Sequence, residues 1–216
     1  MSERTLVLWR HGRTAWNESG RGQGHADIPL DEVGHAQAAA SATMLARLSP
    51  ARLWTSDLLR AVQTAAYLAA LTGLTPEPDK RLREYDLGAR QGLTLDEFAA
   101  AFPAGYAAWF GDDPETVVPG AETRAEVAAR IVPALEEFLA ALDSGQTGVV
   151  VTHGASLKVG LLGVLGWGQE RSQAIRGMDN CAWAVLVEGA DGLRRLTAYN
   201  RIPGGGDDFA SDSGVG

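Results

Sequence analysis

The chain has 216 residues, of which 45% are hydrophobic and 21% charged, and its formal net charge is −8. This length and composition fit one globular domain with a substantial core, and the negative charge argues against a nucleic-acid or anionic-membrane partner. No apolar stretch is long enough to cross a membrane, and no signal peptide is expected before the first apolar run. The single cysteine, Cys181, is expected to be a reduced core residue in a cytoplasmic protein.

Apolar runs bounded by polar or Gly-rich segments predict alternating strands and helices in the first half of the chain. In chain order these are a strand at 5–9, a polar loop at 10–30, a helix at 31–48, a strand at 51–55, a helix capped by Ser56 or Asp57 that runs to about Leu71, a strand end and turn at 82–92, and a short helix that starts at the capping box Thr94–Glu97.

The second half begins with a segment at 102–120 that mixes aromatic residues with Pro, Gly and Asp, which we interpret as a lid that is mobile or only partly ordered. The elements that follow are a helix at about 123–142 that Pro133 should kink or break, a strand at 149–152, a helix at about 156–165, strands at 182–187 and 193–199 with a turn between them, and a tail at 204–216 of disordered composition. These boundaries define one domain at 1–203. The strand at 182–187 is expected to be an edge strand that could pair in a homodimer.

The alternation of strands and helices predicts an α/β fold, a three-layer α/β/α sandwich with a mostly parallel central sheet. Ligands of such sheets bind beyond the carboxyl ends of the strands. Arg10, His11 and Gly12 follow the first strand directly, and His153 and Gly154 follow the strand at 149–152 in the same way. We therefore expect the two histidines to face each other across one pocket.

These residue types suit phosphoryl transfer. A neutral imidazole nitrogen of His11 can attack phosphorus, while the guanidinium of Arg10 can hold two phosphoryl oxygens. Arg60, near a helix start, can complete a phosphate cradle, although a surface ion pair with Asp57 is the alternative. A histidine satisfied within the core is likewise the alternative for His11.

A carboxylic acid is also needed, because a phosphate ester leaves as a poorly stable alkoxide. Glu84 is the candidate for this acid, and Asp86 is its local rival. The side chain of Asn17 and the backbone amide of Gly154 are candidate donors to phosphoryl oxygens.

Other polar residues are weaker candidates. Gln23 and Gly24 are offered as substrate-binding residues, whereas His25 and His35 are expected on the surface. The four histidines show no paired ligand spacing and no carboxylate cluster, so no metal and no cofactor are expected.

Together these motifs resemble the histidine phosphatase superfamily, whose members are also called phosphoglycerate mutase-like proteins. The segments that carry the resemblance occur in collinear order between residues 5 and 200. They are Leu8 to Asn17, Asp27 to Leu30 with Gly34 and Gln37, Thr55 to Ala61, Leu82 to Gly88, Pro119 to Thr123, and Val151 to Gly154.

The resemblance implies a phosphohistidine mechanism without a metal. His11 would become transiently phosphorylated, Arg10, Arg60 and His153 would stabilise the phosphoryl charge, and Glu84 would protonate the leaving group and then activate water. The acid phosphatase branch of the superfamily carries Asp after the second histidine. Gly154 occupies that position here, so the acid should be Glu84.

The resemblance favours a phosphomonoesterase that acts on a small phosphorylated metabolite, with a sugar-phosphoglycerate, a ribazole phosphate or a broad range of esters as substrates. Two alternatives remain open: a cofactor-dependent phosphoglycerate mutase and a non-catalytic binding protein. Hydrolysis is favoured over mutase activity because His153 follows Glu84 by only 69 positions (153 − 84), whereas mutases usually carry a longer insertion there. Arg13 departs from the usual family pattern and could contact a second anionic group of the substrate.

Overall fold

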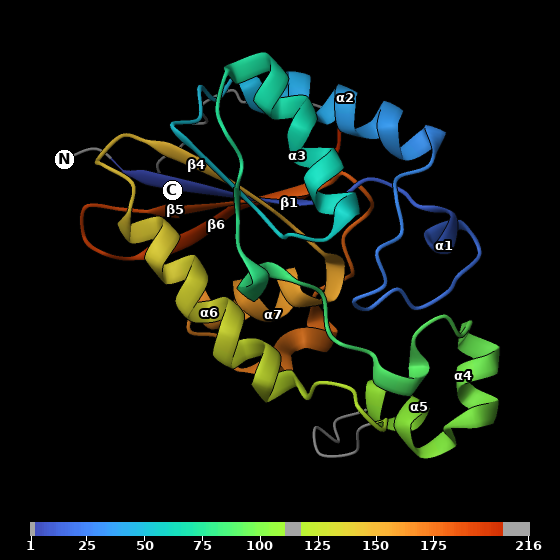
Figure 1. The fold of residues 1–216 in the computed structure, drawn as a ribbon. Helices are drawn as coiled ribbons and strands as arrows, with labels where there is room; N and C mark the ends of the chain where they lie inside the picture. The colour runs from blue at the N-terminus through green and yellow to red at the C-terminus, as the bar shows by residue number, and fades with distance from the viewer. Residues whose placement is uncertain (1–2, 111–117, 205–216) are drawn as a thin grey trace.

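The computed structural model describes residues 3–110 and 118–204, which form a six-stranded sheet with helices on both faces (Figure 1). The strand order is β3-β2-β4-β1-β5-β6. The strands are β1 (Arg4–Arg10), β2 (Arg52–Thr55), β3 (Glu77–Pro78), β4 (Thr147–Thr152), β5 (Trp183–Glu188) and β6 (Arg194–Arg201). The first four are parallel, whereas β5 and β6 are antiparallel additions. This confirms the predicted α/β fold with a mostly parallel sheet.

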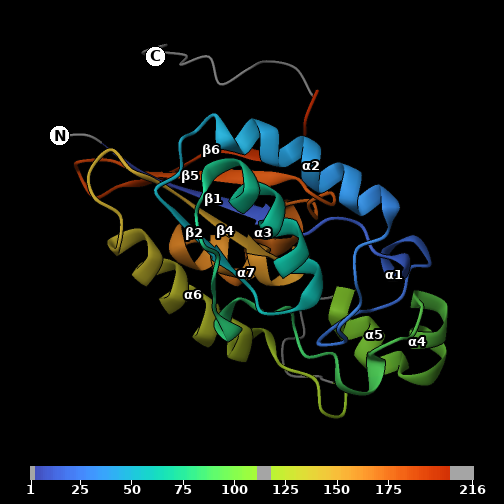
Figure 2. The same ribbon diagram turned by 45° about the horizontal axis from the view of Figure 1, so that its top comes forward.

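Two pairs of helices form the outer layers (Figures 1 and 2). Helices α2 (Glu32–Ala46) and α3 (Leu59–Thr72) cover one face of the sheet, and α6 (Arg124–Ala140) and α7 (Gly154–Val164) cover the other. The remaining α-helices lie beyond the carboxyl end of β1; they are α1 (Ala15–Glu18), α4 (Leu95–Ala101) and α5 (Pro103–Phe110). Single 3-10 turns occur at Lys80–Leu82 and Gly88–Arg90, and a six-residue 3-10 helix at Gln169–Ala174. No helix of the described part is long and apolar enough to cross a membrane.

Strand β1 is buried on both faces because it lies between β4 and β5 at the centre of the sheet. Side chains alternate between faces along a strand. Leu6 and Leu8 accordingly join the core under α6 and α7, whereas Val7 and Trp9 join the core under α2 and α3. The central position of β1 thus anchors the residues that follow it.

Backbone contacts also hold the loop after β1. A Cβ atom at Gly12 would lie 2.6 Å from the carbonyl oxygen of Gly34, and a Cβ at Gly34 would lie 2.0 Å from the carbonyl oxygen of Arg13. Only residues without a side chain allow this approach, so the two glycines let the start of α2 pack directly on the loop.

The structure corrects several element predictions in the first half of the chain. The region 82–92 contains no strand, and its turns are 3-10. The loop at 10–30 contains the short helix α1, whose capping box is formed by Thr14 and Asn17. Helix α3 begins at Leu59, and the carboxylate of Asp27 accepts from the N–H of Leu59.

In the second half, α6 continues through Pro133 and the predicted break is wrong. Pro133 lies on the exposed side of a helix whose opposite side packs in the core, so water can satisfy the carbonyl that loses its partner. The expectation of an edge at 182–187 is also wrong, because β5 lies between β1 and β6. The lid prediction for 102–120 falls partly on α5 and partly outside the described residues, and most of the tail at 204–216 also lies outside them.

Candidate active site

The two strand-end histidines meet as the sequence predicts. Strands β1 and β4 are hydrogen-bonded neighbours, and Arg10 is paired in register with Thr152. His11 and His153 therefore leave the sheet side by side, with ring centroids 5.1 Å apart and ring planes at 57°. Both residues are almost completely buried.

The hydrogen bond of His11 defines its tautomer. Its Nδ1 atom lies 2.7 Å from the carbonyl oxygen of Gly12. A carbonyl only accepts, so Nδ1 carries the proton and Nε2 keeps its lone pair. Burial, followed by the nearby cations Arg60 and Arg10, holds the pKa of His11 well below 6.5. The ring is therefore neutral at physiological pH, with an unprotonated Nε2.

His153 adopts the opposite tautomer. Its Nδ1 accepts from Nε of Arg60 at 3.2 Å, which leaves the proton on Nε2, and Nε2 lies 2.9 Å from the hydroxyl oxygen of Ser56. Burial is the largest cause that keeps the pKa of His153 well below 6.5, and the charge of Arg60 is the next. Both imidazoles of the pair are thus uncharged.

Arg60 comes from the first turn of α3 and is fully buried. Besides His153, its guanidinium donates to the carbonyl oxygens of Ala26 and Gly24, at 2.8 and 2.9 Å. These partners are uncharged, and the predicted alternative partner, Asp57, pairs instead with Arg83. Burial lowers the pKa of Arg60 to about 10, so the group remains cationic at neutral pH.

Arg10 lies against the start of α7. A Cβ atom at Gly154 would lie 3.2 Å from its Nε atom, which is buried and has no hydrogen-bond partner among residues 3–110 and 118–204. Its Nη1 atom donates to the carbonyl oxygen of Met178. Glycine at position 154 therefore gives the guanidinium room, and an Asp at this position would crowd it.

Glu84 reaches the same place from the loop after the 3-10 turn at Lys80–Leu82. Its carboxylate accepts from the N–H groups of Ala155 and Ser156, at 3.0 and 2.8 Å, and from its neighbour Tyr85. Glu84 thus caps the N-terminus of α7, where unpaired N–H groups favour a carboxylate. The rival Asp86 instead accepts from Gly88 N–H and lies near His25.

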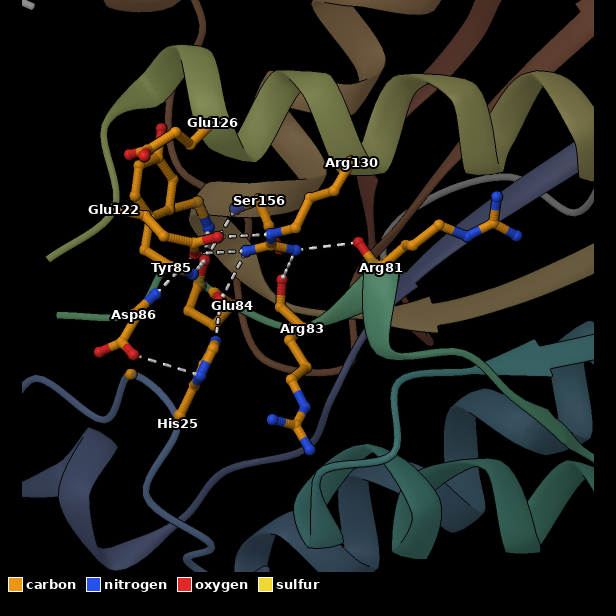
Figure 3. A network of polar contacts seen from close by, with 12 residues as sticks. His25, Arg81, Arg83, Glu84, Tyr85, Asp86, Glu122, Glu126, Arg130 and Ser156 are labelled. Atoms are coloured by element: carbon orange, nitrogen blue, oxygen red, sulfur yellow. Dashed lines mark hydrogen bonds and ion pairs between the residues drawn. The ribbon is translucent and has the colours of Figure 1, made fainter.

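Arg130 of α6 holds the Glu84 loop in place (Figure 3). Its guanidinium donates to the carbonyl oxygens of Arg81, Arg83 and Glu84, at 2.7–2.9 Å. It also forms a bidentate ion pair with Glu122, both contacts being 2.8 Å. Burial alone would raise the pKa of Glu122, but hydrogen bonds from Arg130 and from the N–H of Asp86 outweigh burial and lower it.

Of the remaining candidates, Gly24 lies beside Arg60 with Gln23 next to it in the chain, whereas the side chains of Asn17 and Arg13 are held by other partners. Gly24 supplies a carbonyl to Arg60, and Gln23, its neighbour in the chain, is buried, with no hydrogen-bond partner for Oε1 in the part of the chain that the structure describes. Asn17 uses its side-chain oxygen within the capping box of α1 and toward the amide of Asn180. Arg13, by contrast, is paired with Asp31 and Glu18.

A cavity of about 450 Å³ lies next to the start of α7. Arg10, Glu84 and Gly154 are among the residues that line it. Residues of α4, α5, α6 and α7 contribute to its lining, together with Arg90 and residues of the segments 85–87, 118–123 and 172–178. No group of three or more His, Cys, Asp or Glu residues within 3–110 and 118–204 is arranged to hold a metal ion.

Sequence reasoning missed three residues near the site. Arg130 and Arg90 carry no motif, because their partners lie far away in the sequence or are aromatic rings. His25 was expected on the surface, but it is only partly exposed and its Nε2 lies 2.9 Å from the carbonyl oxygen of Glu84. Free, buried Cys181 agrees with its expected place in the core.

Comparisons with known proteins show the family of this chain. The chain is 36% identical over 193 residues to the glucosyl-3-phosphoglycerate phosphatase of Mycolicibacterium vanbaalenii, covering 87% of this chain and 85% of that protein. It is 40% identical over 159 residues to the metal-independent phosphoserine phosphatase of Arabidopsis thaliana, covering 71% and 65%. The structure of a mycobacterial glucosyl-3-phosphoglycerate phosphatase in complex with VO3 superposes with a TM-score of 0.84 at 36% identity, covering 91% of this chain and 98% of that one. The family model of the histidine phosphatase superfamily (branch 1) matches residues 6–201, and the chain belongs to this superfamily.

Proposed function

We propose that this chain is a metal-independent phosphomonoester hydrolase that acts on a small phosphorylated metabolite through a phosphohistidine intermediate. The observation that carries the proposal is the pair of neutral imidazoles, with ring centroids 5.1 Å apart, beside the buried guanidinium of Arg60 and the partly buried guanidinium of Arg10. The names of its relatives, which include two phosphatases, support hydrolysis.

In the first step, the lone pair on Nε2 of His11 forms a bond to phosphorus while the bond from phosphorus to the ester oxygen breaks. Glu84 enters this step protonated, with a proton from solvent or from the water consumed in the preceding turnover, and passes it to that leaving oxygen, so an alcohol is released rather than an alkoxide. Glu84 lines the cavity, which is therefore the place for the leaving group.

In the second step, Glu84 accepts a proton from water as the water oxygen attacks phosphorus. The bond between Nε2 and phosphorus breaks, and inorganic phosphate leaves with His11 neutral again. Arg10, Arg60, the backbone N–H of Gly154 and the amide of Asn17 would bind the phosphoryl oxygens in both steps, and His153 would do so with its Nε2–H, turned from Ser56 toward the phosphoryl group. Charges fixed in a buried site contribute most because water screens them little.

The assay is hydrolysis of p-nitrophenyl phosphate in the presence of EDTA. We expect turnover by the native chain and near-complete loss in His11→Ala. His35→Ala is the matched control, because the His35 imidazole lies 3.0 Å from the hydroxyl group of Tyr67, between α2 and α3, and its loss should leave the rate unchanged. A requirement for added divalent metal, or full activity in His11→Ala, would contradict the mechanism.

Two further measurements separate the alternatives. A phosphorus NMR time course with 3-phosphoglycerate shows free phosphate if the chain is a hydrolase, and 2-phosphoglycerate if it is a mutase. Rapid quenching with labelled substrate should trap an alkali-stable, acid-labile phosphoenzyme in the native chain but not in His11→Ala. A chain that accepts no label from any phosphate ester would instead be a binding protein on this fold.

A further inference from the structure

The cavity beside Glu84 is more positive than the chain as a whole. Besides Arg10, its lining includes Arg90, Arg124 and Lys158. Its carboxylates are Glu84, which caps α7, and Glu122, which is paired with Arg130. The cations of this lining are therefore not neutralised by the carboxylates beside them, although the net charge of the chain is −8.

Arg90 is the least satisfied of these cations. It is 8% exposed, and its Nε and Nη1 atoms are buried without a hydrogen-bond partner among the described residues. Its Cζ atom lies 4.4 Å from the ring centroid of Phe98 and 4.1 Å from that of Trp109. The rings hold the guanidinium in place but offer no acceptor to Nε and Nη1, whose N–H groups point outward in the plane of the guanidinium.

A buried, unpaired guanidinium is costly for a folded protein, because desolvation is not repaid by an ion pair. Burial lowers the pKa of Arg90 to about 10, and the charge of Glu84 opposes that shift, so Arg90 is still cationic at neutral pH. A ligand that supplied an anion would remove this cost. Arg13, the cation predicted from sequence for a second anionic group, is already paired with Asp31 and Glu18.

We propose that Arg90 is a specificity residue that binds a carboxylate of the substrate, so that the chain prefers phosphomonoesters of carboxylic acids over their uncharged analogues. The inference rests on the proposed function, because it places the phosphoryl group at His11 and the rest of the substrate in the cavity. A carboxylate fits because its two oxygens match the planar donors of a guanidinium.

The test compares two ligands that differ at one carbon. 3-Phosphoglycerate carries a carboxylate where glycerol 3-phosphate carries a hydroxymethyl group. We expect the native chain to show a kcat/KM about 10- to 100-fold higher for 3-phosphoglycerate, which is the range for charge-assisted hydrogen bonds in a buried site. Arg90→Met keeps a side chain of similar length between the rings, and it should abolish this preference while hydrolysis of p-nitrophenyl phosphate stays within a few-fold.

Binding provides a readout that does not need turnover. Isothermal titration of the native chain and Arg90→Met with both ligands should show the same loss of discrimination, even if neither ligand is hydrolysed. Arg90→Gln is the second variant if Arg90→Met does not fold. Equal affinity of the native chain for the two ligands, or an undiminished preference in the variants, would overturn the assignment. Absence of p-nitrophenyl phosphate hydrolysis with intact discrimination would instead refute the proposed function alone.

Discussion

The contacts of Arg130 predict that this residue stabilises the Glu84 loop far more than an ordinary surface arginine does. Arg130→Met removes three hydrogen bonds to carbonyl oxygens and the bidentate ion pair with Glu122, while keeping most of the apolar stem. The Arg130 and Glu122 side chains are 19% and 22% exposed, so water replaces the lost contacts only in part.

The magnitude follows from these partners. A hydrogen bond to a charged group contributes about 1.5–3 kcal/mol, but contacts of one side chain are not additive. Removal of one partner from a largely buried ion pair costs about 3–5 kcal/mol, and we expect a loss of that size in the free energy of unfolding. For a chain of this length, this corresponds to a fall in Tm of roughly 6–20 °C.

Arg81→Met is the matched control, because Arg81 lies in the 3-10 turn just before this loop and its side chain, paired with Asp79 and Glu137, is 38% exposed against 19% for Arg130. It should cost less than about 1 kcal/mol. Both variants are measured by urea unfolding at neutral pH, and kcat is measured below the Tm of each. In Arg130→Met, kcat should fall while KM changes less, because Glu84 loses its anchor. Equal stability losses in the two variants, or an unchanged kcat in folded Arg130→Met, would refute this account of the loop.

The remaining predictions concern the histidines and two glycines. Because folding lowers the pKa of His11 and His153, the unfolded chain binds more protons below pH 6.5 and stability falls as pH falls, approaching about 1.4 kcal/mol per pH unit for each histidine. Urea unfolding in phosphate-free buffer between pH 6 and 5 should show that the free energy of unfolding falls less steeply with pH in His11→Gln than in the native chain, by about 1.4 kcal/mol per pH unit. The same steepness in both proteins would show that folded His11 takes up a proton. Gly154→Ala places a Cβ 3.2 Å from Nε of Arg10, so kcat/KM should fall about 10-fold while the Tm changes little. A kcat/KM equal to that of the native chain would mean that Arg10 can move aside without loss of activity. Gly34→Ala places a Cβ 2.0 Å from a backbone oxygen of the loop after β1, so we expect a loss of at least about 3 kcal/mol in urea unfolding, and a loss below 1 kcal/mol would show that this packing is adjustable.

The sequence predicted the strand-end part of the site well, because local signals define it. The apolar run before His11 and the one before His153 indicate two buried strands, and the rule for parallel sheets brings their carboxyl ends together. The capping box at Thr94 likewise depends on residues three positions apart, and the structure confirms it.

Contacts between distant segments could not be predicted in this way. The hydrogen bonds of Glu84 to the start of α7 join residues 71 and 72 positions apart, and those of Arg130 to the Glu84 loop join residues 46 to 49 apart. The break expected at Pro133 was wrong for a related reason, because packing of the opposite side of α6 outweighs the loss of one hydrogen bond. Local propensity is a weak guide wherever tertiary packing decides.

The adjacency of β1 and β4 has a consequence for what can evolve in this protein. Neighbouring strands in any sheet are about 4.8 Å apart, and the 5.1 Å between the rings of His11 and His153 is close to that separation. The adjacency of the two strands thus brings the imidazoles together whatever lines the rest of the cavity. New substrates can be accommodated by changes in the helices that line the cavity, whereas the place of the reacting group is set where the two strands end.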